Sequence, residues 1–183
     1  MAFLTEGELR SKSSIAKSKL LYKSANQILN ESYRNFSAYK VYDIFLSHSF
    51  LDAELILGLK EHLEEFNLSV YVDWIEDNKL DRSKVNRETA DLLRTRMRAC
   101  KSLIYAVSDK SDKSRWMPWE LGYFDGHKNG KVAIMPITQN TNDQFIGEEY
   151  LLLYKYVEKI PKTYSFEKDK LKINGVEVKT WIG

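Results

Sequence analysis

An alternation of short apolar strands with amphipathic helices most limits how this 183-residue chain can fold. Residues 41–47 (VYDIFLS) and 68–74 (LSVYVDW) are rich in β-branched and aromatic residues, which is typical of strands. Between them, residues 51–66 carry leucines at helical spacing, so the three segments together predict a βαβ unit. Near-continuous apolar strands joined by helices indicate a parallel sheet that is covered on both faces.

The same pattern continues toward residue 140. We expect a helix to begin at Asn86 as its N-cap, and strands to follow over residues 102–108 and 131–137. The sequence therefore predicts an α/β fold, with a doubly wound, flavodoxin-like parallel sheet of about five strands, over residues 41–140.

Two extensions flank this predicted domain. Residues 1–40 predict an N-terminal helical extension, with one helix from about Glu6 to Asn30. Residues 141–183 predict a C-terminal extension that contains a short strand or helix, followed by a β-hairpin. Its turn is expected at Asn174 and Gly175, a favoured two-residue pair.

Composition excludes several classes of protein. The chain is 43% hydrophobic and 30% charged with a formal net charge of +2, which is typical of a folded protein and too small a charge to predict a nucleic-acid partner. Its single cysteine, Cys100, cannot form an internal disulfide, and no run approaches the roughly 20 apolar residues of a membrane span. We expect a cytoplasmic protein that binds neither membranes nor nucleic acid.

The common catalytic and cofactor motifs are absent from the sequence. The residues after the first expected strand are SHSF, without the glycines of a dinucleotide-binding loop, so a Rossmann dehydrogenase is not expected. The chain also lacks a phosphate-binding loop, the HExxH zinc motif and the GxSxG nucleophile turn. We therefore expect no metal and no cofactor.

One carboxylate, Glu120 in SRWMPWELG, has a setting that suggests chemistry. Pro118 belongs in the first turn of a helix, which places Glu120 near the helix N-terminus, at the sheet edge where ligands bind. An anionic carboxylate between the indoles of Trp116 and Trp119 would suit a reaction that develops positive charge, such as an oxocarbenium ion. Alternatively, Glu120 only complements its helix dipole and the two tryptophans are core residues.

Five segments in order resemble the successive boxes of a bacterial TIR (Toll/interleukin receptor homology) domain: YDIFLSHS, VDWIEDNKLDRS, SLIYAVS, RWMPWE and KVAIMPI. The resemblance covers about residues 40–140 and excludes both extensions. It implies an NAD+-cleaving enzyme in which NAD+ is a substrate and no cofactor is needed. Trp116 and Glu120 match the W-x-x-x-E pattern of this family, whose glutamate is essential for cleavage.

The same resemblance implies which residues would line the nucleotide pocket: Phe45, Leu46, Ser47 and Trp74. Arg82 and Lys84, in the loop after the second expected strand, are further candidates that could bind a pyrophosphate. The alternative interpretations are core packing for the aromatic residues, local turn bonding for Ser47 and solvation for the loop charges.

One carboxylate would be enough for NAD+ cleavage, because nicotinamide leaves as a neutral base from a cationic pyridinium and needs no general acid. The sequence leaves open whether water then gives ADP-ribose or an internal nucleophile gives a cyclic isomer. The family resemblance also implies self-association through TIR domains. It further implies a signalling role like that of Thoeris anti-phage systems, in which a separate effector protein senses the nucleotide product.

Two other functions remain open from the sequence. TIR domains also serve as noncatalytic adaptors, although an adaptor would not need Glu120. A nucleoside deoxyribosyltransferase has a related fold and glutamate chemistry, but it would need a nucleophilic carboxylate.

Overall fold

The computed structural model describes residues 2–48, 52–74, 86–108, 114–141, 143–145, 147–164 and 169–183. Within these residues the strands form one eight-stranded sheet of order β3-β2-β4-β5-β6-β7-β8, with β1 beside β5. The strands are β1 (Leu4–Thr5), β2 (Tyr42–Ser47), β3 (Val70–Val72), β4 (Cys100–Val107), β5 (Val132–Thr138), β6 (Lys155–Ile160), β7 (Lys170–Ile173) and β8 (Val176–Glu177). The five strands from β3 to β6 run parallel in flavodoxin-like order, which confirms the predicted α/β fold.

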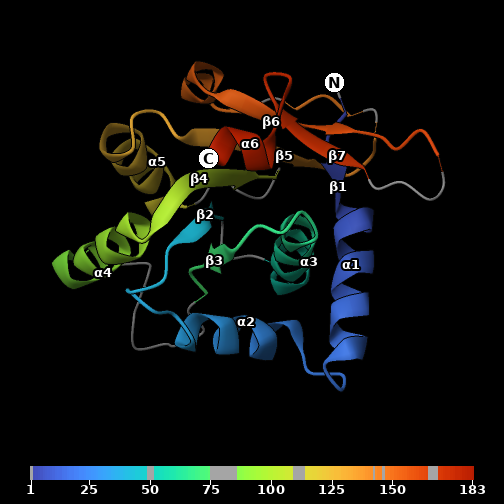
Figure 1. The fold of residues 1–183 in the computed structure, drawn as a ribbon, viewed down its shortest axis with the longest axis horizontal. Coiled ribbons are helices and arrows are strands. Elements are labelled where there is room, and N and C mark those ends of the chain that lie inside the picture. Colours follow the sequence, from blue (N-terminus) through green and yellow to red (C-terminus); the bar gives the residue numbers. More distant parts are fainter. Residues whose placement is uncertain are drawn as a thin grey trace.

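Helices cover both faces of the sheet (Figure 1). They are α1 (Glu6–Lys19), α2 (Ala25–Arg34), α3 (Ala53–Glu64), α4 (Arg87–Arg98), α5 (Trp116–His127), α6 (Val178–Ile182) and the short 3₁₀ helix η2 (Glu149–Leu153). On one face an α1/α3 cluster of buried residues includes Leu9, Leu46, Leu59 and Val72. On the other face an α4/α5 cluster includes Phe45, Leu93, Leu121 and Phe124. Helix α2 packs against α3 and the edge strand β3.

The N-terminal extension differs from its prediction. Two helices, α1 and α2, replace the single helix expected from Glu6 to Asn30. They are separated at Leu21 and Tyr22, whose φ angles of 55° and 59° are left-handed and cannot continue a helix. Neither residue is the glycine that usually marks such a conformation, so no local pattern predicted the break.

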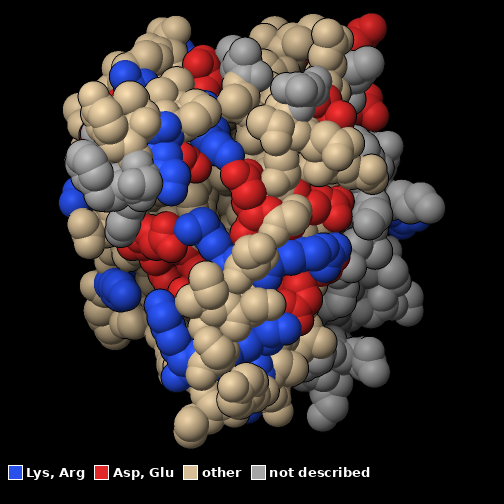
Figure 2. All heavy atoms as spheres, turned by 90° about the vertical axis from the view of Figure 1, so that its right-hand side faces the viewer, with Lys and Arg blue, Asp and Glu red and all other residues tan. Residues whose placement is uncertain are grey.

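Helix α1 is an integral part of the α1/α3 cluster. It crosses α3 at Gly58, where a Cβ atom would lie 1.9 Å from the carbonyl oxygen of Leu9, so only glycine allows the two backbones to approach this closely. Three ion pairs join the same helices: Arg10–Asp52, Lys12–Glu65 and Lys17–Glu54. Figure 2 shows cationic and anionic side chains interspersed over this face.

The C-terminal extension contains the predicted hairpin. Asn174 and Gly175, with φ angles of 50° and 80°, connect β7 to β8 in antiparallel pairing. Upstream, η2 precedes β6, which pairs parallel with β5 and continues the sheet. No helix in the described part of the chain is long and apolar enough to span a bilayer.

Candidate active site

A buried hydrogen bond joins two of the predicted site residues across the fold. Ser47, the last residue of β2, donates from Oγ to Oε2 of Glu120 in α5 at 2.6 Å. The two residues are 1% and 3% exposed. Such a short bond to a buried carboxylate is stronger than a bond between neutral groups and fixes the orientation of the carboxylate. It lies where β2 ends, at the sheet edge where ligands of this fold class bind.

Glu120 occupies a core position of α5. The buried residues of this helix are Trp116, Met117, Glu120, Leu121 and Phe124, so the carboxylate lies within an otherwise apolar helix face. Pro118 is the third residue of α5, as predicted, and Glu120 follows in the second turn. An acid that merely complemented the helix dipole would be expected on the solvated side, and its burial therefore indicates a more specific role.

The structure divides the other predicted pocket residues between the two faces of the sheet. Phe45 alternates with Ser47 on the α4/α5 side and is fully buried there, whereas Leu46 belongs to the α1/α3 cluster. Trp74 also belongs to the α1/α3 cluster, where its ring stacks on His48 at 5.6 Å. The structure thus brings Phe45, but not Leu46 or Trp74, to the side of Glu120.

The two tryptophans near Glu120 have different environments. Trp116 is buried in the α4/α5 cluster, and its ring meets that of Trp119 edge-on at 5.4 Å. Trp119 is only partly buried and stacks on Tyr123, with the guanidinium of Arg94 5.3 Å from its ring centre. Trp116 therefore contributes to the core beside Glu120, and Trp119 to an aromatic and cationic stack at the surface.

The remaining two predicted site residues, Arg82 and Lys84, lie outside the described residues. Their contact with a pyrophosphate stays a prediction, as do the pocket roles of Phe45, Leu46 and Trp74.

Tyr105 lies beside Ser47 on the neighbouring strand, a placement that the sequence did not reveal. It is the register partner of Ser47 across β2 and β4, and it is 4% exposed. Its hydroxyl lies 3.3 Å from that of Tyr150 in η2. Burial, and then the contact with Tyr150 and the charge of Glu120, raise the pKa of Tyr105 well above its usual value. In the sequence it stands inside the apolar segment SLIYAVS, which carries no local signal for a site residue.

Another buried carboxylate, Asp73, follows β3. It is 2% exposed, and its Oδ1 accepts a hydrogen bond from the hydroxyl of Tyr71 at 3.1 Å.

Among the described residues, no group of three or more His, Cys, Asp or Glu side chains could hold a metal ion.

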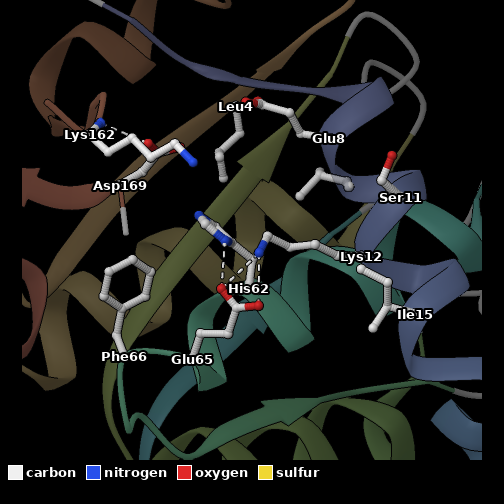
Figure 3. A pocket seen from close by; sticks show the side chains of 11 residues that line it. Leu4, Glu8, Ser11, Lys12, Ile15, His62, Glu65, Phe66, Lys162 and Asp169 are labelled. Atoms are coloured by element: carbon white, nitrogen blue, oxygen red, sulfur yellow. Dashed lines mark hydrogen bonds and ion pairs between the residues drawn. The ribbon is translucent and has the colours of Figure 1, made fainter. Parts of the chain in front are cut away.

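A cavity of about 400 Å³, whose lining does not include Glu120, lies between α1 and the end of α3 (Figure 3). The acidic side chains in its lining are all paired: Lys12 binds both oxygens of Glu65, and Lys159 pairs with Glu8 and with Asp169. His62 in its wall is 4% exposed, and burial lowers its pKa to about 4, so the imidazole is neutral at pH 7. The pairing of these charges makes the cavity a weaker candidate for the main site than the Ser47–Glu120 pair.

Comparison with known proteins identifies the family of the chain. The chain is 55% identical over 164 residues to a protein of Bacillus cereus (strain MSX-D12) named as a probable 3′ cyclic ADP-D-ribose synthase, ThsB′, and the match covers 87% of this chain and 84% of that relative. It is 34% identical over 85 residues to a protein of Cytobacillus dafuensis provisionally named as a cyclic ADP-D-ribose synthase, TIR2, covering 46% of this chain and 22% of that protein. No protein-family model matches the chain. The chain therefore belongs to the family of TIR-domain proteins that includes these cyclic ADP-D-ribose synthases.

Proposed function

We propose that this protein cleaves the nicotinamide–ribose bond of NAD+ and releases nicotinamide and a cyclic ADP-ribose isomer. The observation that carries the proposal is the carboxylate of Glu120, which is buried in an apolar helix face and held by Ser47 at the ligand edge of the sheet. The names of the two relatives support the same reaction.

The mechanism requires one fixed negative charge. When the bond between the ribose C1′ and the pyridinium nitrogen breaks, its electron pair neutralises the nicotinamide, which then leaves without needing a proton. Positive charge develops on the ribose as an oxocarbenium ion, and the carboxylate of Glu120 stabilises it in surroundings from which water is excluded. Ser47 keeps the carboxylate in one orientation, so little reorganisation is needed at the transition state.

Cyclisation follows when a hydroxyl of the adenosine ribose attacks C1′ in place of water. We infer the 3′ isomer as the main product, because the relative that matches 87% of this chain is named for that isomer. The proposed reaction uses NAD+ as a substrate and needs no cofactor or metal.

We further infer that the protein acts in the cytoplasm, self-associates through its TIR domain and signals to a separate nucleotide-sensing effector in anti-phage defence. These inferences rest on the family to which the chain belongs. Analytical ultracentrifugation of the purified protein over a range of concentrations, with and without NAD+, tests the self-association.

Product analysis tests the enzymatic proposal. Purified protein at high concentration is incubated with NAD+, and nicotinamide, ADP-ribose and cyclic ADP-ribose isomers are separated by chromatography. Glu120→Gln should slow nicotinamide release at least about 10²- to 10³-fold, whereas Glu177→Gln, the same substitution at an exposed position in β8, should not alter it. If the unaltered protein released no nicotinamide under any of these conditions, the noncatalytic adaptor role would be favoured.

A further inference from the structure

We propose that the hydroxyls of Tyr105 and Tyr150 form a proton relay that carries the proton of the attacking ribose hydroxyl from the buried site to solvent. The relay would favour cyclisation over hydrolysis. This inference rests on the proposed function and assigns two further residues to the same site.

The side chain of Tyr105 lies next to that of Ser47. Ser47 and Tyr105 are register partners on the adjacent parallel strands β2 and β4, so their side chains extend from the same face of the sheet. Neighbouring strands are about 4.8 Å apart, which places the phenol ring beside the serine that binds Glu120. Tyr105 and Trp116 belong to the same α4/α5 cluster. The Tyr105 side chain therefore borders the carboxylate site.

The hydroxyls of Tyr105 and Tyr150 contact each other. Their oxygens are 3.3 Å apart, and either hydroxyl could be the donor. Two hydroxyls carry two protons, but their mutual contact uses one. The hydroxyl that accepts this bond keeps a proton for which the described residues supply no acceptor. A substrate oxygen or a water molecule could accept that proton, so the pair can hold one more partner.

Tyr105 and Tyr150 differ in how deeply they are buried. Tyr105 is 4% exposed, whereas Tyr150 in η2 is half-buried. The hydroxyls therefore connect the interior, beside Glu120, with the surface of the molecule. The pKa of Tyr105 is raised by burial first, so its phenol stays neutral at pH 7. A neutral phenol can still accept one proton while it donates another, which is what a relay requires.

The proposed step balances as follows. The oxygen of the adenosine-ribose hydroxyl forms a bond to C1′ of the oxocarbenium ion as its own O–H bond breaks. That proton passes to the oxygen of Tyr105, the Tyr105 proton passes to Tyr150, and the Tyr150 proton passes to solvent water. A water nucleophile could lose its proton to neighbouring water, but a ribose hydroxyl in a dry site needs such a path. The sum is one NAD+ converted to cyclic ADP-ribose, nicotinamide and one proton.

The experiment compares product ratios of variants that lack one hydroxyl but keep the ring. Tyr150→Phe is the primary variant, because a half-buried position tolerates the change, and Tyr105→Phe removes the buried hydroxyl. Tyr154→Phe is the matched control, because its hydroxyl binds Asp125 at 3.3 Å from just beyond the same helix η2. The ratio of cyclic product to ADP-ribose is measured at equal NAD+ consumption.

We expect the ratio to fall about tenfold in Tyr150→Phe and in Tyr105→Phe, since loss of positioned proton transfer typically costs at least that much. Tyr154→Phe should keep the parental ratio. A merely structural role would change the amount of folded protein and the total turnover, but not the ratio.

Three results would overturn the inference in distinguishable ways. An unchanged ratio in both tyrosine variants would refute the relay and leave the role of Glu120 intact. Production of ADP-ribose alone by the unaltered protein would refute cyclisation and the relay together. No nicotinamide release from the unaltered protein would refute the proposed function, and the relay with it.

Discussion

Replacing Ser47 with alanine removes the hydroxyl that holds the Glu120 carboxylate while leaving the carboxylate in place. Both residues are almost completely buried, so water cannot easily replace the lost donor. The side chain shrinks by one oxygen atom, and the strand pairing of β2 uses only the backbone. The substitution therefore changes the orientation of Glu120 more than it changes the fold.

The size of the effect follows from the 2.6 Å bond between Ser47 and Glu120. Hydrogen bonds to charged groups contribute about 1.5–3 kcal/mol, so we expect the free energy of unfolding of Ser47→Ala to fall by about that amount. If the same bond holds the carboxylate toward the oxocarbenium ion, losing it should slow nicotinamide release about 10- to 100-fold, since 1.4 kcal/mol corresponds to a factor of ten.

Ser13→Ala is the matched control for this prediction. Ser13 in α1 is fully buried and donates from its hydroxyl to the carboxylate of Glu54, so it also forms a serine–glutamate bond, but on the α1/α3 side. Chemical denaturation and nicotinamide release are measured for both variants. Ser13→Ala should lose a similar amount of stability, about 1.5–3 kcal/mol, and keep its turnover per folded molecule. Equal turnover in the two variants would refute the assignment of Ser47 to the site.

The contact between α1 and α3 and the buried histidine give two further predictions. Gly58→Ala should destabilise the protein by about 1–3 kcal/mol or more in chemical denaturation, because the new methyl group would overlap the backbone of Leu9. Gly126→Ala in α5, where a methyl group meets nothing within 4 Å, should instead stabilise it by about 0.5–1 kcal/mol, and the opposite order would contradict the crossing at Gly58. The free energy of unfolding should fall as the pH drops from about 6.5 to 4, because His62 takes up a proton in the unfolded state before it does so in the folded state. Over this window the parental protein should lose about 3 kcal/mol more stability than the His62→Leu variant. If the stability of both proteins changed equally with pH, the imidazole would not be buried in its neutral form.

Much of the fold could be predicted because each element carries its own local signal. The apolar strands and the leucine spacing of α3 predicted a parallel sheet, and Asn86 predicted the start of α4, where its side chain accepts from the backbone N–H of Thr89. The carboxyl-edge rule then placed Ser47 and Glu120 at one end of the sheet, although 73 residues separate them. Their direct hydrogen bond depends on how α5 packs, which no local pattern describes.

The placement of some residues could not be predicted from local patterns, and for Leu46 the alternation of side chains along a strand had to be applied more strictly. Leu46 and Ser47 are neighbours in a strand, so their side chains had to point to opposite faces, and this rule alone would have questioned Leu46 as a pocket residue. The pairing of Tyr105 with Tyr150 joins residues 45 positions apart and has no sequence signal. The break at Leu21 depends on a left-handed conformation at a residue type that rarely adopts it.

The rate of nicotinamide release by Glu120→Gln tests the central claim most directly. Glutamine keeps the shape of the side chain and a hydrogen-bonding oxygen for Ser47, but it removes the negative charge. At saturating NAD+, with folding verified by circular dichroism, we predict a rate at least about 10²- to 10³-fold below that of the unaltered protein. A rate within a few-fold of the parental value would show that the charge of Glu120 does not stabilise the oxocarbenium ion, and would contradict the account.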